Sequence, residues 1–345
     1  MTVIERRTTE PPANLRQAWR DAHVAPLWES PTAHKPGPAG ARGHVWRWET
    51  MRPLIEGALA VQSPAAVERR VLSLVNPTCD SDSHAPVTRT IAAAVQILMP
   101  GESARPHRHT MNALRFVLEG SGAATIVDGK SCPMAEGDLI LTPAWCWHEH
   151  VHEGSGPVIW LDVLDVPLHD YLGTSVFEPG PAHDVPPTVD DRAFAMPNLV
   201  PDIGEPEPPY SPVFRYPWEV ARAAVAAAPR GADGARRVRY ANPLSGGSSM
   251  ALLDSSLVEL VADEPTVPIR TTSSAVCAVV EGTGSTRVGD DDIAWGPRDI
   301  IALPPGNWIS HRARGGAARL FMVTDREVFR RLGLLREELA PRGSP

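Results

Sequence analysis

The sequence predicts an all-β protein that contains two copies of one antiparallel β-barrel or jelly-roll domain, with peripheral helices. From Thr90 onward, strand-length runs rich in Val, Ile and Leu are separated by Gly, Pro, Asp and Asn. This rhythm is typical of antiparallel barrels and sandwiches. An internal repeat indicates two copies, and the 345 residues suit two domains of about 150 residues each.

The segments follow one another in a clear order. Residues 1–85 hold scattered tryptophans and prolines, and we expect them to form a wrapping segment that can reach neighbouring subunits. Residues 86–175 form the first predicted barrel. Residues 176–217 are rich in proline, which is typical of a linker or a surface-wrapping segment. Residues 218–345 form the second predicted barrel.

Three segments outside the strands have helical patterns. The first is Leu15–His23, and the second is 218–230, where good helix formers end near a proline. The tail REVFRRLGLLREELA, residues 326–340, is predicted to be one amphipathic helix.

The repeat is divergent but ordered. At an offset of 162 residues the first set is Pro106, Arg108, Thr110, Ala113, Val117, Glu119, Gly120 and Gly122, and it meets Pro268, Arg270, Thr272, Ala275, Val279, Glu281, Gly282 and Gly284. After a slip of one residue, Asp138, Ile140, Pro143 and Trp147 meet Asp299, Ile301, Pro304 and Trp308.

Three histidines of the first copy form a candidate metal site. His107 and His109 are two residues apart in PHRHT, and such residues point to the same face of a strand. His148 follows in PAWCWHEH, a second histidine run at a strand end. A lone histidine in a strand is more often a hydrogen-bonded structural residue. The HxH spacing, the second histidine run and the glycines at fixed offsets together favour metal binding.

The second copy has lost this set. Its aligned positions hold Ile269, Thr271 and Ile309, so we expect one metal site per chain and a structural second barrel. Imidazole suits Zn, Cu, Fe and Ni alike, so the ligands alone do not choose the metal.

These motifs resemble the cupin superfamily, and nearly the whole chain resembles the gentisate 1,2-dioxygenase family of bicupins, which includes salicylate and 1-hydroxy-2-naphthoate dioxygenases. The matching motifs are VERRVLSLVNP, QILMPGESARPHRHT, ALRFVLEG, GDLILTPAWCWHEH, VIWLDVLD, RYANPLSGG and LGLLREE. The usual cupin glutamate ligand is missing, because TMNALRF contains no acid before Glu119.

The resemblance implies a reaction and a cofactor. It implies an Fe(II)-dependent dioxygenase that opens a 2-hydroxybenzoate-type acid, such as gentisate or salicylate, between the carboxyl-bearing and hydroxyl-bearing carbons. Both atoms of O2 would enter the product. Three protein ligands leave open positions for a bidentate substrate and O2, and redox-inert Zn(II) could not pass electron density to O2.

The resemblance also implies roles for further residues. Arg115 would bind the substrate carboxylate, for which its planar fork is suited, although a structural salt bridge on the barrel wall is the alternative. His150 would hydrogen-bond or deprotonate the substrate hydroxyl. Gln96 would line the pocket. Asp162 would line it too, or fix the tautomer of a ligand histidine.

Two arginines, Arg69 and Arg70, form a second candidate contact for the substrate, with a surface pair as the alternative. The pocket wall is predicted to include Ala92 and Ala94. Relatives commonly have an aromatic residue where Ala92 stands, so the wall is reshaped here and gentisate itself is in question.

Two other function classes stay open. One is a non-catalytic metal-binding cupin, and the other is a metal-dependent cupin isomerase or decarboxylase. The charged pocket set argues against the first, and the absent glutamate ligand argues against the second.

Composition limits the partners and the setting. The net charge of −8 gives no cationic field for nucleic acid or anionic lipid. No apolar run reaches the roughly 20 residues that cross a membrane. The four cysteines form no CxxC pair, and the charged N-terminus does not resemble a signal peptide, so we expect a cytoplasmic protein. The family resemblance implies a homo-oligomer, often a tetramer.

Overall fold

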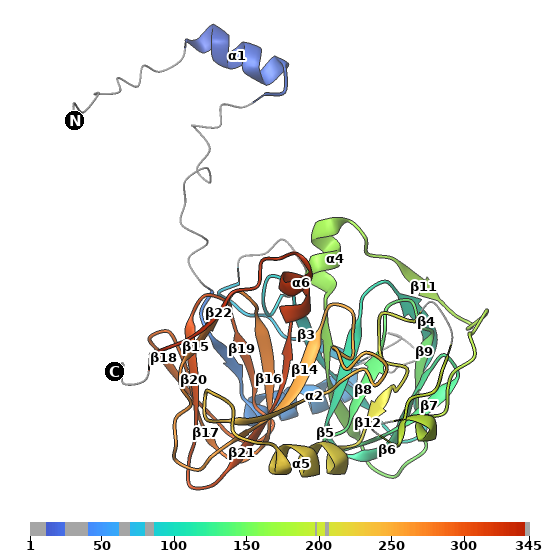
Figure 1. The fold of residues 1–345 in the computed structure, drawn as a ribbon. Helices are drawn as coiled ribbons and strands as arrows, with labels where there is room; N and C mark the ends of the chain where they lie inside the picture. Colours follow the sequence, from blue (N-terminus) through green and yellow to red (C-terminus); the bar gives the residue numbers. More distant parts are fainter. Residues whose placement is uncertain are drawn as a thin grey trace. The chain divides into compact units, whose positions relative to one another are not determined.

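The computed structural model divides into two units, Met1–Ala39 and Gly40–Pro345. The first unit contains helix α1 (Ala13–Asp21), which corresponds to the helix expected at Leu15–His23. The second unit contains every strand described below (Figure 1). The structure describes residues 12–24, 41–61, 70–79, 86–196, 199–203 and 207–341.

The first barrel consists of two antiparallel sheets that face each other (Figure 1). Among the described residues, one sheet has the strand order β12-β8-β5-β10-β3-β2 and the other has the order β11-β4-β9-β6-β7. The strands are β2 (Val71–Ser73), β3 (Ala92–Leu98), β4 (Ser103–His109), β5 (Ala113–Glu119), β6 (Ser121–Val127), β7 (Lys130–Ala135), β8 (Leu139–Thr142), β9 (His148–His152), β10 (Val158–Leu164), β11 (Phe177–Pro179) and β12 (Arg215–Tyr216).

The second barrel repeats this plan. In the part of the chain that the structure describes, its sheets have the orders β1-β19-β16-β21-β14-β13 and β18-β17-β20-β15-β22. The strands are β1 (His44–Trp46), β13 (Arg236–Arg239), β14 (Asp254–Leu260), β15 (Ile269–Thr271), β16 (Ala275–Glu281), β17 (Gly284–Val288), β18 (Asp291–Trp295), β19 (Ile300–Leu303), β20 (Trp308–Ala313), β21 (Ala318–Thr324) and β22 (Glu337–Leu339). The predicted all-β fold with two barrels is therefore confirmed.

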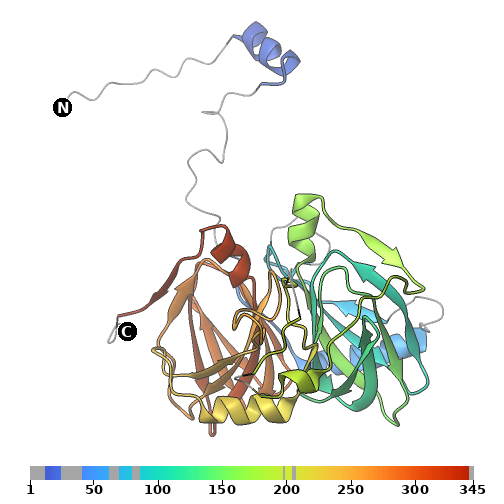
Figure 2. The same ribbon diagram turned by 45° about the vertical axis from the view of Figure 1, so that its right-hand side comes forward.

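The helices of the second unit lie at the edges and ends of the barrels (Figure 2). Helix α5 packs against β13 and β14, and α2 contacts β3. No helix among the described residues is long and apolar enough to cross a membrane. The helices of the second unit are α2 (Trp48–Val61), α4 (Val166–Leu172), α5 (Trp218–Ala227) and α6 (Arg326–Arg331), with a short 3-10 turn η2 (Asp191–Phe194).

The two barrels share one hydrophobic core. A single cluster of buried side chains runs from the β5 and β10 sheet of the first barrel to the β16 and β21 sheet of the second. At its centre the rings of Phe116 and Phe321 stack with centroids 4.1 Å apart and planes 9° apart. Such a stack adds to the burial of two large rings, so the barrels form one packed body rather than two independent ones.

Each barrel also takes a strand from the other half of the chain. Strand β1, which precedes α2, pairs with β19 of the second barrel, whereas β12, which precedes α5, pairs with β8 of the first. Both strand–helix junctions are held in the same way. Asp299 accepts a hydrogen bond from the main chain of Trp48 at 2.7 Å, and Asp138 accepts one from Trp218 at 2.9 Å.

Asp138 and Asp299 are aligned with each other in the sequence repeat, and they make equivalent contacts in the two barrels. Each is almost fully buried, and each also binds an arginine from the exchanged strand or its neighbour. A carboxylate at the first N–H groups of a helix satisfies donors that the helix cannot satisfy and meets the positive end of its dipole. The two aspartates thus fix where the exchanged segments dock.

The C-terminal tail and the proline-rich segment contain strands that their sequence patterns do not predict. The tail is not one helix, because α6 ends at Arg331, Gly333 has a φ of 71°, and Glu337–Leu339 pairs with β15. Glycine readily adopts this left-handed conformation, which ends the helix and turns the chain back to the sheet. The proline-rich segment 176–217 contributes β11 and β12 to the first barrel, so its boundaries as a linker remain a proposal.

Replacing Asp138 or Asp299 with Ala should lower the free energy of unfolding by about 1–3 kcal/mol each, because buried helix N–H groups and an arginine lose their acceptor. The exposed Asp292→Ala serves as the control and should stay within about 0.5 kcal/mol. Denaturant titration of the three variants measures the effect. Equal stability of all three would contradict the docking role of the buried carboxylates.

Candidate metal centre

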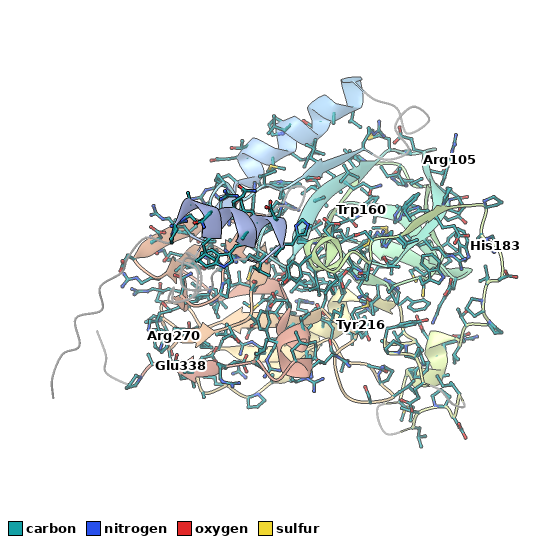
Figure 3. The ribbon with its side chains drawn as sticks, turned by 90° about the horizontal axis from the view of Figure 1, so that it is seen from above. Arg105, Trp160, His183, Tyr216, Arg270 and Glu338 are labelled. Carbon is teal, nitrogen blue, oxygen red and sulfur yellow. The ribbon has the colours of Figure 1, made fainter. Side chains whose placement is uncertain are left out.

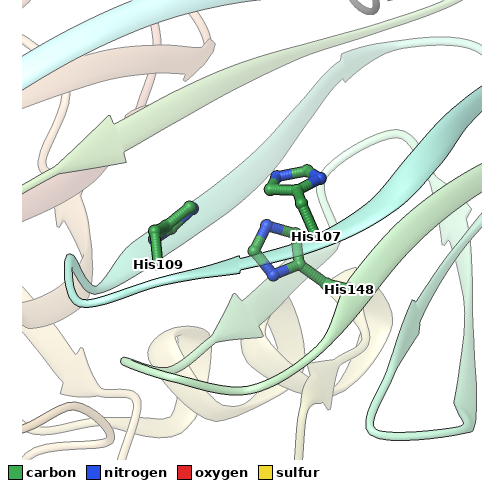
Figure 4. Close-up of side chains that lie close together, drawn as sticks. All are labelled: His107, His109 and His148. Atoms are coloured by element: carbon green, nitrogen blue, oxygen red, sulfur yellow. The ribbon is translucent and has the colours of Figure 1, made fainter. Parts of the chain in front are cut away.

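Three histidines converge inside the first barrel (Figure 4). His107 and His109 lie on β4, where alternation places both on one face. His148 begins β9, and the pairing of β4 with β9 sets it directly opposite His107. All three side chains are buried, with at most 4% of any residue exposed.

The histidine ligand atoms all lie within 4.8 Å of one another. The ring centroids of His107 and His148 are 4.2 Å apart, and those of His109 and His148 are 4.8 Å apart. In the described part of the chain this is the group of metal-ligating side chains that comes close enough to hold an ion. The prediction of a three-histidine site in the first barrel is confirmed.

Main-chain carbonyls orient all three rings. The Nδ1 atoms of His107, His109 and His148 lie 3.0, 2.9 and 3.0 Å from the carbonyl oxygens of Arg105, Met111 and Cys146. A carbonyl oxygen only accepts, so each Nδ1 carries the proton and each Nε2 keeps its lone pair for a metal.

The Nε2 lone pairs of the site suit a bound cation better than a hydrogen bond within the protein. Nε2 of His148 is buried and has no hydrogen-bond partner among the described residues. Burial, the positive charge of Arg115 and the neighbouring histidines hold the pKa of His148 well below its usual value, so the ring stays neutral. A buried lone pair without a partner is costly, and a divalent metal would satisfy it.

No carboxylate joins the three histidines in the described residues. Asn112, on the turn after His109, is tied to Asp165 through its main-chain N and its Nδ2, both at 2.8 Å. Glu119, the next acid along the chain, pairs with Arg52 at 2.8 Å. The ligand set is therefore neutral, as the sequence predicts, and a bound metal keeps its full charge for an anionic partner.

The wall beside the histidines carries a buried ion pair. Arg115 on β5 and Asp162 on β10 are direct cross-strand neighbours, and Nε of Arg115 lies 3.2 Å from Oδ1 of Asp162. Arg115 also donates to the hydroxyl of Thr142. The indole N–H of Trp160 donates to Asp162 at 3.1 Å.

The remaining predicted pocket residues occupy the same strands. Gln96 is buried on β3 opposite Trp160, and Ala94 and Ala92 lie opposite Asp162 and Leu164. Strand alternation therefore puts Gln96, Ala94 and Ala92 on one face, together with the buried ion pair. Main-chain carbonyls, rather than Asp162, accept the Nδ1 bonds of the ligand histidines.

His150 lies two residues beyond His148 on β9 and is fully buried. Its Nδ1 is 3.0 Å from the hydroxyl of Thr125 on β6. Its ring lies 5.1 Å from the ring of Trp160, which Figure 3 labels in the first barrel. His152, the third histidine of this strand, instead bonds Gly154 and Gly156 at the end of the barrel.

Of the two arginines predicted as a second substrate contact, the structure describes only Arg70. Arg70 is buried and pairs with Glu102, whose carboxylate also accepts from the main chain of Met99 at 2.8 Å. Burial lowers the pKa of Arg70. Arg69 lies outside the described residues. The substrate contact expected of either arginine therefore stays a prediction.

Sequence reasoning missed one residue beside the metal ligands. The ring of Phe177 stacks on that of His107, with centroids 5.2 Å apart and planes 22° apart. Phe177 lies on β11, which pairs with β4 but comes from the proline-rich segment. The proline-rich composition of its surroundings gave no signal that this segment reaches the site.

Comparison with known proteins agrees with the geometry of the three-histidine site. A family model described as a cupin domain matches residues 94–164. A 5-aminosalicylate 1,2-dioxygenase of Comamonas sp is 39% identical over 337 residues, covering 94% of this chain and 89% of that protein. A gentisate 1,2-dioxygenase of Aquipseudomonas alcaligenes is 34% identical, covering 91% of this chain and 92% of that protein.

Solved structures agree over the full length. A salicylate 1,2-dioxygenase from Pseudaminobacter salicylatoxidans has a TM-score of 0.88 at 30% identity, covering 96% of this chain and 99% of that one. With these matches and the three-histidine centre in hand, the chain belongs to the gentisate 1,2-dioxygenase family of ring-cleaving bicupin dioxygenases, which includes salicylate and 1-hydroxy-2-naphthoate dioxygenases.

Proposed function

We propose that this protein is an Fe(II)-dependent dioxygenase that opens the ring of a 2-hydroxybenzoate between the carboxyl-bearing and hydroxyl-bearing carbons. The observation that carries this proposal is the neutral set of three buried histidines with a buried arginine close by. Bound at these histidines, Fe(II) would supply a route for electron density from a chelated ring to O2.

Charge supports an acidic substrate. Three imidazoles add no negative charge to the metal, and the charge of Arg115 is near enough to lower the pKa of His148. A substrate that chelates through a carboxylate and a phenolate would compensate the positive charges of the metal and of Arg115. A glutamate ligand would have used part of that charge, and the described residues supply none.

Arg115 is proposed to orient the substrate carboxylate. Its guanidinium is fixed by Asp162 and Thr142, so little side-chain entropy remains to be lost when a second anion binds. Arginine presents its N–H donors in a planar fork, which matches the geometry of a carboxylate. A buried arginine fixed in this way selects both the charge and the plane of a bound carboxylate.

His150 is proposed to hold the proton of the substrate hydroxyl. Its Nδ1 is bonded to Thr125, and Nε2 is the other nitrogen of a ring that shares the face of His148. Neutral imidazole accepts a phenol proton near neutral pH. Gln96, with Trp160 and the small wall residues Ala92 and Ala94, would shape the space for the ring.

The relatives favour a particular substitution pattern. 5-Aminosalicylate and gentisate, named for two of the relatives above, share a carboxylate, an adjacent hydroxyl and a polar group opposite that hydroxyl. A homologous salicylate dioxygenase at 29% identity and a TM-score of 0.88 is described as an adduct with gentisate. We therefore propose a salicylate with an electron-donating group at this position as the substrate class. The family resemblance also favours a cytoplasmic homo-oligomer, such as a tetramer.

Iron-loaded protein should consume one O2 per substrate with at least one of gentisate, 5-aminosalicylate, salicylate and 1-hydroxy-2-naphthoate. Both atoms of labelled O2 should appear in the ring-opened product. Benzoate and 3-hydroxybenzoate are the matched controls, because neither can chelate through a carboxylate and an adjacent hydroxyl. No uptake with any of the four acids would refute the reaction class, and equal rates without O2 would favour an isomerase or decarboxylase.

Arg115→Gln should reduce kcat/KM for the 2-hydroxybenzoate by about 100-fold, because a buried carboxylate loses its charged partner. Preference for salicylate over salicylamide in competition binding should fall in parallel, which a purely structural role would not cause. Arg105→Gln is the control, since Arg105 is exposed on β4 and only its main-chain carbonyl serves the site. If Arg115→Gln still preferred salicylate over salicylamide as strongly as the unaltered chain, Arg115 would have only a structural role in the barrel wall.

A further inference from the structure

The second barrel contains a cavity of about 630 Å3. Its walls come from strands β13, β14, β15, β16, β19, β20, β21 and β22, in the barrel that Figures 1 and 2 draw in orange to red. Pockets for small molecules typically measure roughly 300–1,000 Å3. This space is therefore large enough for a ligand, although the barrel has lost its metal ligands.

The cavity occupies the place in the second barrel that corresponds to the three histidines of the first. Ile269, Thr271 and Ile309, the counterparts of the three ligand histidines, all line it. Ile269 lies opposite Ile309 in the strand register, as His107 lies opposite His148. The imidazoles have been exchanged for shorter side chains without the space being filled, so the expectation of a merely structural second barrel is incomplete.

One polar group of the first site is retained here. His311, the counterpart of His150, lines the cavity and is 8% exposed. Its Nδ1 lies 2.8 Å from the hydroxyl of Thr286, as His150 lies against Thr125. The indole N–H of Trp295 donates to that hydroxyl at 2.9 Å. The hydroxyl of the fully buried Thr286 still needs an acceptor for its own proton, and among the described residues Nδ1 of His311 provides it.

This arrangement makes Nε2 of His311 a donor. With Nδ1 accepting from Thr286, the ring proton lies on Nε2, which has no hydrogen-bond partner among the described residues. Burial, with the positive charge of Arg237, lowers the pKa of His311 to about 4, so the ring is neutral. An N–H on a cavity-lining ring that has no protein acceptor can donate to a ligand bound in that cavity.

Arg237 supplies a second donor to the same space. On β13, Arg237 and Arg239 line the cavity, whereas Arg236, which directly precedes Arg237, does not. Arg237 binds Asp233 through one nitrogen at 3.0 Å, and no other partner of its side chain lies among the described residues. The remaining N–H groups of its guanidinium are available to an anion.

The acids around the cavity are already matched. Asp254 accepts from Arg239 at 2.7 Å, and Glu337 accepts from Arg326 at 2.7 Å. Glu338 pairs with Arg270, and Figure 3 labels both on the second barrel. Each carboxylate in the lining therefore has an arginine partner, Asp233 through Arg237. Another part of the lining is apolar, with Leu303, Ile309 and Met322.

We propose that the second barrel binds a small organic carboxylate, with the carboxylate between His311 and Arg237 and the apolar body against Leu303, Ile309 and Met322. Binding there needs no metal, so this site is distinct from the ring-cleaving centre and does not depend on its substrate. Carboxylate oxygens are strong acceptors and suit an arginine and an imidazole N–H. A wall of branched apolar side chains favours an aromatic or branched body.

Isothermal titration of the metal-loaded full chain with benzoate tests this proposal. Arg237→Gln should weaken one binding event at least tenfold, because the carboxylate loses its charged donor. Arg236→Gln is the matched control, since it removes the adjacent arginine on the other face of the same strand, and it should bind as the unaltered chain does. Binding at the metal centre would persist in both variants, which separates the two sites.

Two further titrations complete the test. Ile309→Phe, which fills the cavity with an apolar ring, should abolish the same event, with circular dichroism to confirm that the fold is kept. Benzamide should bind at least tenfold more weakly than benzoate. Equal affinities for Arg236→Gln and Arg237→Gln, or for benzoate and benzamide, would overturn the proposal. A benzoate-soaked crystal with no anion in the second barrel would do so too.

Discussion

The pairing of β4 with β9 is the constraint on which the site depends. Their register sets His107 opposite His148, and alternation along β4 adds His109 to the same face. Carbonyls two residues away then fix each ring through Nδ1. A shift of one residue in this register would turn a whole strand over and destroy the centre. The metal site is thus a property of the sheet more than of any single loop.

The sheet is in turn held by the second barrel. The shared core around Phe116 and Phe321 and the exchanged strands β1 and β12 join the two halves into one body. Asp138 and Asp299 dock the helices that follow those strands. The second barrel has lost the metal ligands but still supports the first, and its open interior retains a threonine–histidine pair.

Much of the fold and of the metal site could be predicted from the sequence, because these features depend on local periodicity and on the internal repeat. The HxH spacing, the repeat and the loss of ligands at Ile269, Thr271 and Ile309 all follow from residue order. The repeat also marked Asp138 and Asp299 as equivalent, but not their role, because their partners lie about 80 and 250 residues away in the chain.

Other features depend on tertiary pairing, which one sequence does not reveal. The contact of Arg115 with Asp162 requires the register of β5 with β10, and the stack of Phe177 on His107 requires β11 to join β4. The tail was predicted as one helix because its apolar spacing fits a helix. Pairing with β15 outweighed that local preference after Gly333.

The metal content of single-histidine variants tests the central claim most directly. His107→Ala, His109→Ala and His148→Ala, each reconstituted with Fe(II) and measured by elemental analysis beside the exposed control His183→Ala, should bind iron far below one ion per chain, while the control binds about one. Near-stoichiometric iron in any of the three variants would contradict the assignment of the centre to these histidines.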